Sequence, residues 1–298
     1  MIGFSQVLLK LVRNPTSLLG IVLVSFFAFI ALFAPLIAPP EYPDEPYLLP
    51  KAGWAIEPSP PSEKHPFGTT EGQYDIFYGI VWGSRTAFKV GFITVVFSAL
   101  IGVIVGSISG YFGGWIDELI MRITDIFMAF PFLVAAMVLT TILGKGLDKV
   151  MIALVVFGWM GYARLIRGSF LSAKEELYVL AAKAIGVSTF KIIFKHILPN
   201  TIYPIVIQAS MNMGSMVVTA SALSFLGVGA PDGYADWGQM ISYARNWIVG
   251  APGEALKYWY TFLYPGGAIA LFVLGWNLLG DAIRDILDPR LRGLKVRE

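Results

Sequence analysis

Six long stretches of this 298-residue sequence contain no Asp, Glu, Lys, Arg or His, and they limit the fold more than any other feature. They are residues 14–40, 90–116, 126–144, 150–163, 201–231 and 258–280. About 20 apolar residues in a helix cross the hydrocarbon core of a bilayer. The composition agrees, with 56% hydrophobic and only 14% charged residues. We therefore expect an all-α integral membrane protein with six transmembrane helices.

Two of the six stretches need a further argument. The first follows basic residues, as the apolar part of a secretion signal does, but its run of residues 18–38 is too long for one. We expect it to be the first transmembrane helix and to stay uncleaved. The fourth stretch is short between Lys149 and Arg164, and we expect these two side chains to snorkel to the membrane interfaces.

The distribution of basic residues predicts the orientation of the chain in the membrane. With a cytoplasmic N-terminus, 14 of the 22 Lys and Arg residues fall on the inner side, which the positive-inside rule favours. We expect a multi-pass protein of the cell (plasma or inner) membrane with both termini in the cytoplasm. The net charge is +2, and the basic residues are spread over the inner loops rather than gathered in one stripe, which indicates no nucleic-acid partner. The absence of Cys excludes disulfides and thiolate metal sites.

A polar insert with helical patterning separates the fourth and fifth stretches. Residues 172–175 have the form of a capping box, which predicts a helix start, and Gly186 suits a left-handed helix end. Ser188 is expected to cap a second helix that runs to Leu198-Pro199. Four apolar residues of that second helix have i, i+3, i+4, i+7 spacing: Phe190, Ile193, Phe194 and Ile197. This spacing predicts an amphipathic helix at the membrane surface.

The order and spacing of these residues resemble the cytoplasmic coupling loop, or EAA loop, of permease subunits in binding-protein-dependent ABC importers, in the dipeptide/oligopeptide branch. The resemblance implies that residues 164–200 form the cytoplasmic coupling loop and that its elbow, residues 172–200, docks on a separate ATPase subunit. The implied coupling residues are Tyr178, Ala181, Ala182, Lys183, Ala184, Gly186, His196, Leu198 and Pro199. Leu180 stands where the family motif is named for Glu, so a charge contact is not expected there. The pattern alone also fits an interfacial helix that binds no partner.

The segment 39–80 is rich in proline, with nine Pro residues that disfavour regular helix and central strand. We expect an extended, ordered strap on the external side. Part of it resembles an external motif of the same permease branch, carried by His65, Pro66, Phe67, Gly68, Thr69 and Asp75. Tyr74 stands where this branch commonly has Arg. This difference bears on the identity of the substrate more than on the assignment to the permease family.

The third and fifth stretches carry further expectations. Pro131 is expected to kink or restart the third helix, after a short inner connection in which Asp117, Arg122 and Asp125 pair with one another. Small residues along the fifth stretch favour close packing with neighbouring helices. In related permeases the fifth helix lines the translocation path, which makes Met213, Met216 and Thr219 candidate path residues. Packing in the core is the alternative for the two methionines.

The external loop 230–260 is rich in aromatic residues: Tyr234, Trp237, Tyr243, Trp247, Tyr258, Trp259 and Tyr260. A belt at the membrane interface explains most of them without a function. The more specific alternative is a functional surface on which sugars stack or a binding protein docks.

No P-loop sequence Gly-x-x-x-x-Gly-Lys-Ser/Thr occurs, so ATP phosphates are not cradled by this chain. We expect a permease that is not an enzyme and has no metal or cofactor of its own, with ATP and Mg bound by partner subunits. The resemblance implies four partners: a second homologous permease, two ABC ATPase subunits and an external solute-binding protein. The chain would form half of a translocation path for short oligopeptides or oligosaccharides. The branch also carries nickel chelates, and the sequence leaves the substrate open.

Two other classes of function compete with this interpretation. An ion-coupled secondary transporter commonly has ionisable residues inside its spans, and the six stretches have none. An intramembrane enzyme needs His or carboxylate clusters at membrane depth, whereas His65 and His196 both lie outside the stretches.

The domain organisation follows from the same features. Residues 1–80 are expected to form the N-terminal transmembrane helix and the external Pro-rich segment. Residues 81–298 are expected to form the core permease domain, with five transmembrane helices and the coupling loop at 164–200. The resemblance implies the type I ABC importer permease fold.

Overall fold

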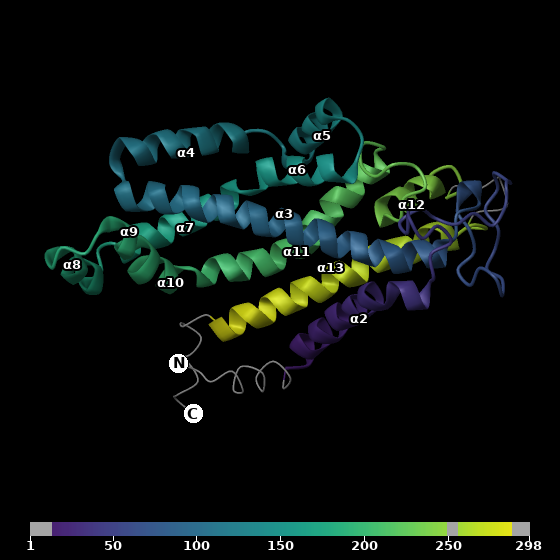
Figure 1. Ribbon diagram of the computed structural model, residues 1–298, viewed down its shortest axis with the longest axis horizontal. Coiled ribbons are helices and arrows are strands. Elements are labelled where there is room, and N and C mark those ends of the chain that lie inside the picture. The colour runs from purple at the N-terminus through teal and green to yellow at the C-terminus, as the bar shows by residue number, and fades with distance from the viewer. Residues whose placement is uncertain (1–13, 249–255, 288–298) are drawn as a thin grey trace.

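The computed structural model of the chain describes residues 14–248 and 256–287. Its long helices run roughly along one axis and form an elongated bundle, with short helices and loops at both ends (Figure 1). In the described part there are no β-strands beyond three isolated bridges. The residues counted on the inner side at the two ends of the chain, 1–13 and 288–298, lie outside the described residues.

Helices long and apolar enough to cross a bilayer are found at five places in the described chain. These are α2 (Pro15–Ile37), α3 (Ile76–Phe112), the continuous pair α6 (Leu147–Gly158) and α7 (Met160–Ala173), α11 (Tyr203–Phe225) and α13 (Tyr260–Leu287). A sixth span results when α4 (Gly114–Met128) and α5 (Phe132–Leu143), which are bent by 84°, are taken together. The prediction of an all-α membrane protein with six spans is confirmed, and the third helix is broken at Pro131 as expected.

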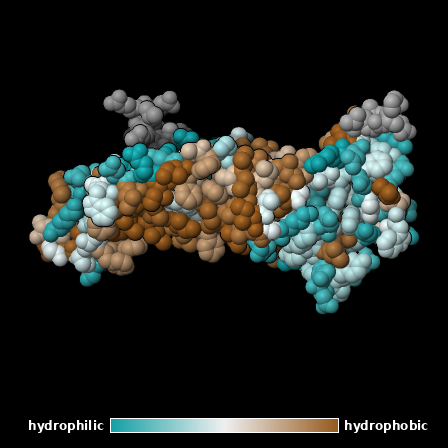
Figure 2. Space-filling view, turned by 90° about the horizontal axis from the view of Figure 1, so that it is seen from above, coloured by the Kyte–Doolittle hydropathy of each residue, from teal (hydrophilic) through white to brown (hydrophobic). Residues whose placement is uncertain are grey.

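Six shorter elements complete the described chain: η1 (Glu71–Gln73), α8 (Leu177–Ala184), α9 (Thr189–Lys191), η2 (Ile192–Ile197), α10 (Leu198–Thr201) and α12 (Trp237–Ala244). They lie at the two ends of the bundle (Figure 1). Figure 2 shows hydrophobic side chains over the middle of one face, with hydrophilic ones gathered toward the ends. This banding is the surface expected for a protein whose middle lies in lipid and whose ends lie in water.

The fourth span is longer than its uncharged stretch, since it runs over 27 residues, Leu147–Ala173. The guanidinium of Arg164 pairs with Asp125 of α4. Lys149 pairs with Asp148, with Nζ 2.8 Å from Oδ2. Both pairs are partly exposed, and the snorkelling of Lys149 and Arg164 to the interfaces stays a prediction.

A close helix approach joins α3 to α7 through three glycines at four-residue spacing. A Cβ atom on Gly106 would lie 2.2 Å from the carbonyl oxygen of Ala163, and one on Gly102 would lie 2.4 Å from Cβ of Tyr162. A Cβ atom on Gly110 would lie 2.7 Å from Cβ of Phe170. Since lipid provides no hydrophobic force between helices, such small residues gain van der Waals contact between backbones. The sequence analysis predicted close packing for the fifth helix. There, a Cβ atom added to Gly214 would lie 3.2 Å from Val273.

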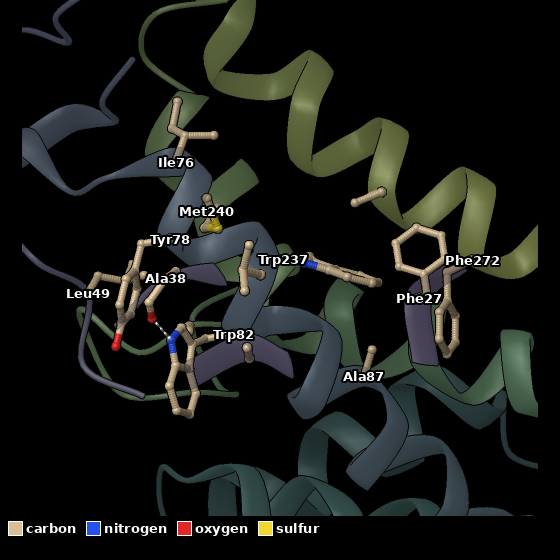
Figure 3. Close-up of a cluster of buried hydrophobic side chains, with 14 of the residues drawn as sticks. Phe27, Ala38, Leu49, Ile76, Tyr78, Trp82, Ala87, Trp237, Met240 and Phe272 are labelled. Atoms are coloured by element: carbon tan, nitrogen blue, oxygen red, sulfur yellow. Dashed lines mark hydrogen bonds between the residues drawn. The ribbon is translucent and has the colours of Figure 1, made fainter. Parts of the chain in front are cut away.

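The Pro-rich strap is ordered and folds over one end of the bundle, as expected. Backbone hydrogen bonds join it to the loop before α12: Leu49 N–H donates to Gly233 O at 2.7 Å, and Ala235 N–H donates to Tyr47 O at 2.8 Å. The indole Nε1 of Trp82 in α3 donates to Ala38 O at 2.9 Å, which holds the start of the strap (Figure 3). The strap, α12 and the ends of α2, α3 and α13 therefore form one cap at this end of the bundle.

The interpretation of the seven aromatic residues of 230–260 as an interfacial belt is wrong for three of them. Trp237, Tyr258 and Tyr260 are buried, with exposed fractions of 2%, 7% and 2%. Trp237 packs edge-on against Phe27 of α2 and Phe272 of α13, with ring centroids 5.6 and 5.7 Å away (Figure 3). The strap covers this loop, so its aromatic residues build the core of the cap and little ring surface remains free.

Asp236 is a carboxylate buried in this cap, and the sequence analysis did not single it out. It is 5% exposed, and its Oδ1 accepts the Gln239 N–H at 2.9 Å, which caps α12. Burial away from water raises the pKa of Asp236 to about 6, from an ordinary value of 3.8. The folded protein therefore holds a proton on Asp236 at pH values where the unfolded chain does not.

We expect Gly106→Ala to lower the unfolding temperature of the detergent-solubilised protein, because the new methyl group meets backbone that cannot move aside. Overpacking of this kind costs about 1–3 kcal/mol. Gly168→Ala on α7 is the matched control, since nothing lies within 4 Å of its Cβ position and Ala favours helix. Equal melting curves for Gly106→Ala and the control would contradict the close α3–α7 approach.

We expect Asp236→Asn to change the pH dependence of stability. The raised pKa in the folded state means that the Asp236 contribution is fully present below pH 4 and is lost as pH rises through about 6. Asn is neutral and still caps a helix, so the variant should gain stability relative to the parent as pH rises from 4 to 7, by on the order of 2 kcal/mol. Melting temperatures measured across this pH range, with the exposed Asp44→Asn as control, check the difference. A parent–variant difference that does not change with pH would refute it.

Candidate functional site

The end of the bundle opposite the cap carries the predicted coupling loop, which forms an elbow of α8, α9, η2 and α10 (residues 177–201) (Figure 1). The predicted start of its first helix is wrong. Ser172 lies inside α7, where its Oγ contacts Gly168 O at 3.4 Å, and α8 begins after Glu176 without a side-chain cap. Helix α7 continues past Ser172 because Phe170 and Ala173 stay packed in the core.

The predicted end of α8 is confirmed. Gly186 has φ of +77°, in the left-handed region that glycine adopts without strain. The Val187 N–H donates to Ala182 O and the Gly186 N–H donates to Lys183 O, both at 3.0 Å. This pair of bonds is a Schellman motif, which satisfies the last carbonyls of the helix and turns the chain into the second half of the elbow.

The predicted coupling residues on α8 divide between two faces. Ala182 is 5% exposed and lies beside the buried Val179, against the body of the protein. The other members are exposed, namely Tyr178, Ala181, Lys183, Ala184 and Gly186. Two apolar side chains that were not among the predicted residues are more exposed than Tyr178, which is 41% exposed: Leu177 at 82% and Ile185 at 80%. Leu180 is 43% exposed, so the motif position that lacks its carboxylate faces outward.

The second half of the elbow differs from the expected amphipathic helix. Ser188 precedes α9 but makes no capping hydrogen bond from its side chain. Residues 192–197 form a π-helix, whose wider turns shift the inward face. Ile193 and Ile197 are buried as expected, but Phe190 and Phe194 are 70% and 50% exposed and pack on each other, with centroids 4.4 Å apart.

The remaining predicted elbow residues lie where the chain returns to the membrane. The carbonyl of His196 accepts a hydrogen bond from Asn200 Nδ2 at 2.7 Å, and its ring is partly buried. Leu198 is partly buried, while Pro199 is exposed in the first turn of α10, where proline costs no hydrogen bond.

The elbow is fixed to the bundle by a continuous apolar core. That core contains Ile166 and Phe170 of α7, Val179 and Ala182 of α8, and the isoleucines of η2. In addition, Nζ of Lys183 lies 5.6 Å from the ring centroid of Tyr111, at the end of α3. A force applied to the elbow is therefore applied directly to α7 and α3.

Charge pairing at this end differs from the expectation that Asp117, Arg122 and Asp125 pair with one another. Arg167 of α7 holds Asp117 of α4 with two hydrogen bonds, Nε to Oδ1 and Nη2 to Oδ2, each 2.6 Å. Arg164, one turn earlier, pairs with Asp125. The connection from α3 to α4 is short, since only Gly113 separates the two helices, and Asp117, Arg122 and Asp125 all lie within α4. The signal available in the sequence was the three-residue spacing of the two Arg residues, which places them on one face of a helix.

The predicted external motif is brought together at the start of α3. Asp75 caps α3 by accepting the Tyr78 N–H at Oδ1 (2.7 Å), and its Oδ2 lies 2.5 Å from Nδ1 of His65. Phe67 stacks on Tyr264 of α13 with centroids 4.2 Å apart, and Oγ1 of the buried Thr69 accepts the Ser59 N–H at 2.8 Å.

Two other residues of the motif are placed by the backbone. Gly68 has φ of +75° and Pro66 is exposed. Tyr74, at the position where Arg is common, stacks on Tyr243 and lies 4.7 Å from Nζ of Lys51. The side chains of the motif are thus occupied in tying the strap to α3 and α13.

The three candidate path residues on α11 lie in two environments. Met213 is 3% exposed and packs beside Gly91 of α3. Met216 and Thr219 lie on the wall of a concavity of about 250 Å³, beside Phe132 and Phe157. Sequence reasoning missed these two phenylalanines, because nothing in their local pattern places them near α11. In the described residues no group of three or more His, Asp or Glu side chains is arranged to hold a metal ion.

Comparisons with known proteins agree on one family. Residues 102–293 match the model of the binding-protein-dependent transport system inner membrane component, and residues 4–50 match that of the N-terminal TM domain of oligopeptide transport permease C. The dipeptide transport system permease protein DppC of Alkalihalophilus pseudofirmus is 39% identical over 95% of this chain and 88% of its own length. The oligopeptide transport system permease protein OppC of Bacillus subtilis is 36% identical over 97% and 90%.

A third relative and a solved structure extend the comparison. The glutathione transport system permease protein GsiD of Escherichia coli O6:K15:H31 is 37% identical over 94% of this chain and 88% of its own. Inward-facing MetNI methionine ABC transporter structures include a chain that matches with a TM-score of 0.55 at 20% identity, over 72% of this chain and 98% of that one. That likeness shows the fold alone, and it confirms the expected type I importer permease fold.

The curated relatives are all named as permease proteins of transport systems, and this chain is accordingly a membrane permease component and not an enzyme. The family model spans well over half of its residues, and the named relatives match nearly all of them. The chain belongs to the family of binding-protein-dependent transport system inner membrane components, in the branch of the dipeptide and oligopeptide permease C proteins.

Proposed function

We propose that this chain is the permease subunit of an ATP-driven importer of short peptides, coupled to a separate ATPase through its elbow. The observation that carries the proposal is the set of large apolar and aromatic side chains exposed on the elbow: Leu177, Tyr178, Leu180, Ile185, Phe190 and Phe194. Exposed apolar patches are unfavourable in water and mark contact surfaces. A cleft on an ATPase subunit is the occupant that the family membership supports.

The attachment of the elbow supports transmission of movement from that ATPase. Val179, Ala182 and Ile197 are buried in the same core as Ile166 and Phe170. The elbow therefore moves with α7 and, through the glycine contacts, with α3. ATP binding in the partner would bias the bundle between inward-facing and outward-facing arrangements through this link.

The assembly that we propose contains four further subunits. A second homologous permease completes the translocation path, two ABC ATPase subunits bind ATP and Mg, and an external solute-binding protein delivers the solute. The elbow end is proposed to be cytoplasmic, together with both chain termini, since Arg164, Arg167 and the elbow lysines lie at that end. Residues 1–80 would then contribute the first span and the external strap, and residues 81–298 the core permease domain with the coupling loop at 164–200.

Short peptides are the favoured substrate class. The relatives are named for dipeptide, oligopeptide and glutathione transport. The oligosaccharide alternative depended on a free aromatic surface, but Tyr234 stacks on Tyr47 at 5.3 Å and Tyr243 stacks on Tyr74 at 5.2 Å. Rings stacked on one another offer a sugar little surface. An ion-coupled secondary transporter is less favoured, because the two Arg residues of α7, Arg164 and Arg167, are each paired with an Asp of α4 near the elbow.

We expect Ile185→Glu to abolish stimulated ATPase activity and uptake while the protein still folds, because residue 185 is 80% exposed and packs on nothing in the chain core. Burying a carboxylate in an apolar contact should weaken docking at least tenfold, or more than about 1.4 kcal/mol. Ile185→Leu is the matched control and should retain activity. Co-purification of the ATPase subunits and ligand-stimulated ATP hydrolysis give the measurement. Full activity of the Ile185→Glu variant would show that this part of the elbow does not belong to the coupling surface.

We expect short peptides, and not oligosaccharides, to stimulate ATP hydrolysis by the complete complex in vesicles with its own binding protein. The measurement compares a panel of di- to pentapeptides with a panel of oligosaccharides at equal concentrations. Stimulation by the sugars alone would exclude the peptide assignment. Uptake driven by an imposed ion gradient without ATP would overturn the importer proposal itself.

A further inference from the structure

Helix α4 lies along α3 and α7 on the outside of the bundle (Figure 1). Of its 15 residues only Thr124 is buried, and none belongs to an apolar core of the described chain. Helix α5, the other half of the same span, differs, because Ala136 and Thr140 are fully buried. Apolar packing therefore fixes α5 firmly to the bundle but fixes α4 only weakly.

Two carboxylates of α4 attach it to α7 instead. Asp117 accepts two hydrogen bonds from Arg167, Nε to Oδ1 and Nη2 to Oδ2, each 2.6 Å. Asp117 also accepts a hydrogen bond from the hydroxyl of Ser109 in α3, so it joins three helices at one point. Asp125, two turns further along α4, pairs with Arg164.

The pair of Asp117 and Arg167 is the better shielded of the two. Their side chains are 15% and 33% exposed, whereas those of Asp125 and Arg164 are 55% and 46% exposed. Charges that are shielded from water attract each other more strongly than exposed ones. Two parallel hydrogen bonds also fix the angle between the partners and not only their distance. Asp117 and Arg167 therefore form the firmer attachment of α4 to α7.

The backbone turns at both ends of α4. Gly113 and Gly114, at its start, have φ of +65° and +55°, in the left-handed region that glycine adopts without strain. At the other end the helix stops at Met128, and α5 leaves at 84°. One aromatic contact lies near this end, between Phe127 and Phe157 of α6, with ring centroids 5.8 Å apart. The two ion pairs to α7 thus lie between a glycine turn and the break in the span.

Helix α7 is also the helix to which the elbow is fixed. Ile166 and Phe170 share one apolar core with Val179 and Ala182 of α8. Arg167 lies between these two core residues of α7 in the sequence. A displacement of the elbow therefore displaces the guanidinium that holds Asp117.

We propose that Asp117 and Arg167 form the joint through which the elbow moves α4 during transport. The inference rests on the proposed importer function. When the elbow shifts α7, the two hydrogen bonds from Arg167 carry Asp117 and α4 with it, while the packing of α5 holds the other half of the span in place. The bend between α4 and α5 takes up the difference. Asp117 and Arg167 are thus positioning residues for coupling.

The amount of peptide imported for each ATP hydrolysed tests the proposal, because a pair that only stabilises the fold would lower both rates together. Asp117→Asn keeps the shape of the side chain and removes its charge. The variant is assayed in the complete complex in vesicles, with its binding protein and short peptides. We expect import per ATP to fall at least about fivefold, within the range by which single mutations alter coupling between sites, while stimulated ATP hydrolysis persists.

Three further variants sharpen the comparison. Glu118→Gln is the matched control and should keep the ratio of the parent, since Glu118 is the next residue of α4, is exposed and makes no ion pair within the described residues. Arg167→Lys keeps the charge but loses the two parallel hydrogen bonds, and it should give an intermediate ratio. The double variant Asp117→Arg with Arg167→Asp exchanges the charges, and it should recover import per ATP relative to either single change.

The outcomes separate this inference from the proposed function, since the parent complex is assayed in the same vesicles. If the parent imports peptide and Asp117→Asn keeps the parent's ratio, the inference is wrong. Equal losses of import and ATP hydrolysis, without recovery in the double variant, would give the pair a structural role only and would also overturn it. If Asp117→Asn does not fold, Arg167→Lys and the double variant decide by the same ratio. A parent complex that imports no peptide would instead count against the proposed function.

Discussion

The backbone contact between α3 and α7 is the interaction on which the rest of the structure depends. With Gly102, Gly106 and Gly110 facing α7, the two helices approach until a Cβ atom on α3 would overlap atoms of α7. In a bilayer this close packing replaces the hydrophobic force that would hold helices together in water. It places Arg164 and Arg167 of α7 beside α4, where Asp125 and Asp117 neutralise them.

Helix α3 also connects the two functional ends of the molecule. Its first residue follows Asp75, which caps the helix and contacts His65 in the external strap. Its last turn lies beside the elbow, where Tyr111 meets Lys183. The backbone contacts of α3 with α7 lie in its elbow-side part, at Gly102, Gly106 and Gly110, and α3 itself continues from there to the cap. The break in the third span, between α4 and α5, is bent by 84°.

Local sequence chemistry predicted those features that depend on one segment at a time. Gly186 was predicted to end α8 in the left-handed region because no other residue adopts it as cheaply, and it does so. Pro131 was predicted to break the third helix because it cannot complete the hydrogen-bond pattern, and the break lies there. The capping box at Ser172 failed for a complementary reason: the packing of Phe170 and Ala173 outweighs the capping of a new helix, so α7 runs on.

The sequence by itself determined that the chain spans a membrane about six times, that its third span is broken, and that its family is that of importer permeases. Apolar length, proline geometry and an ordered motif are all properties of neighbouring residues. Only the tertiary structure decided that Arg167 pairs with Asp117, that Trp237 lies in a core rather than at an interface, and that Phe132 and Phe157 meet α11. Those outcomes depend on which helices lie side by side. Arg167 and Asp117 are 50 residues apart in the sequence, so no local sequence pattern predicts that they pair.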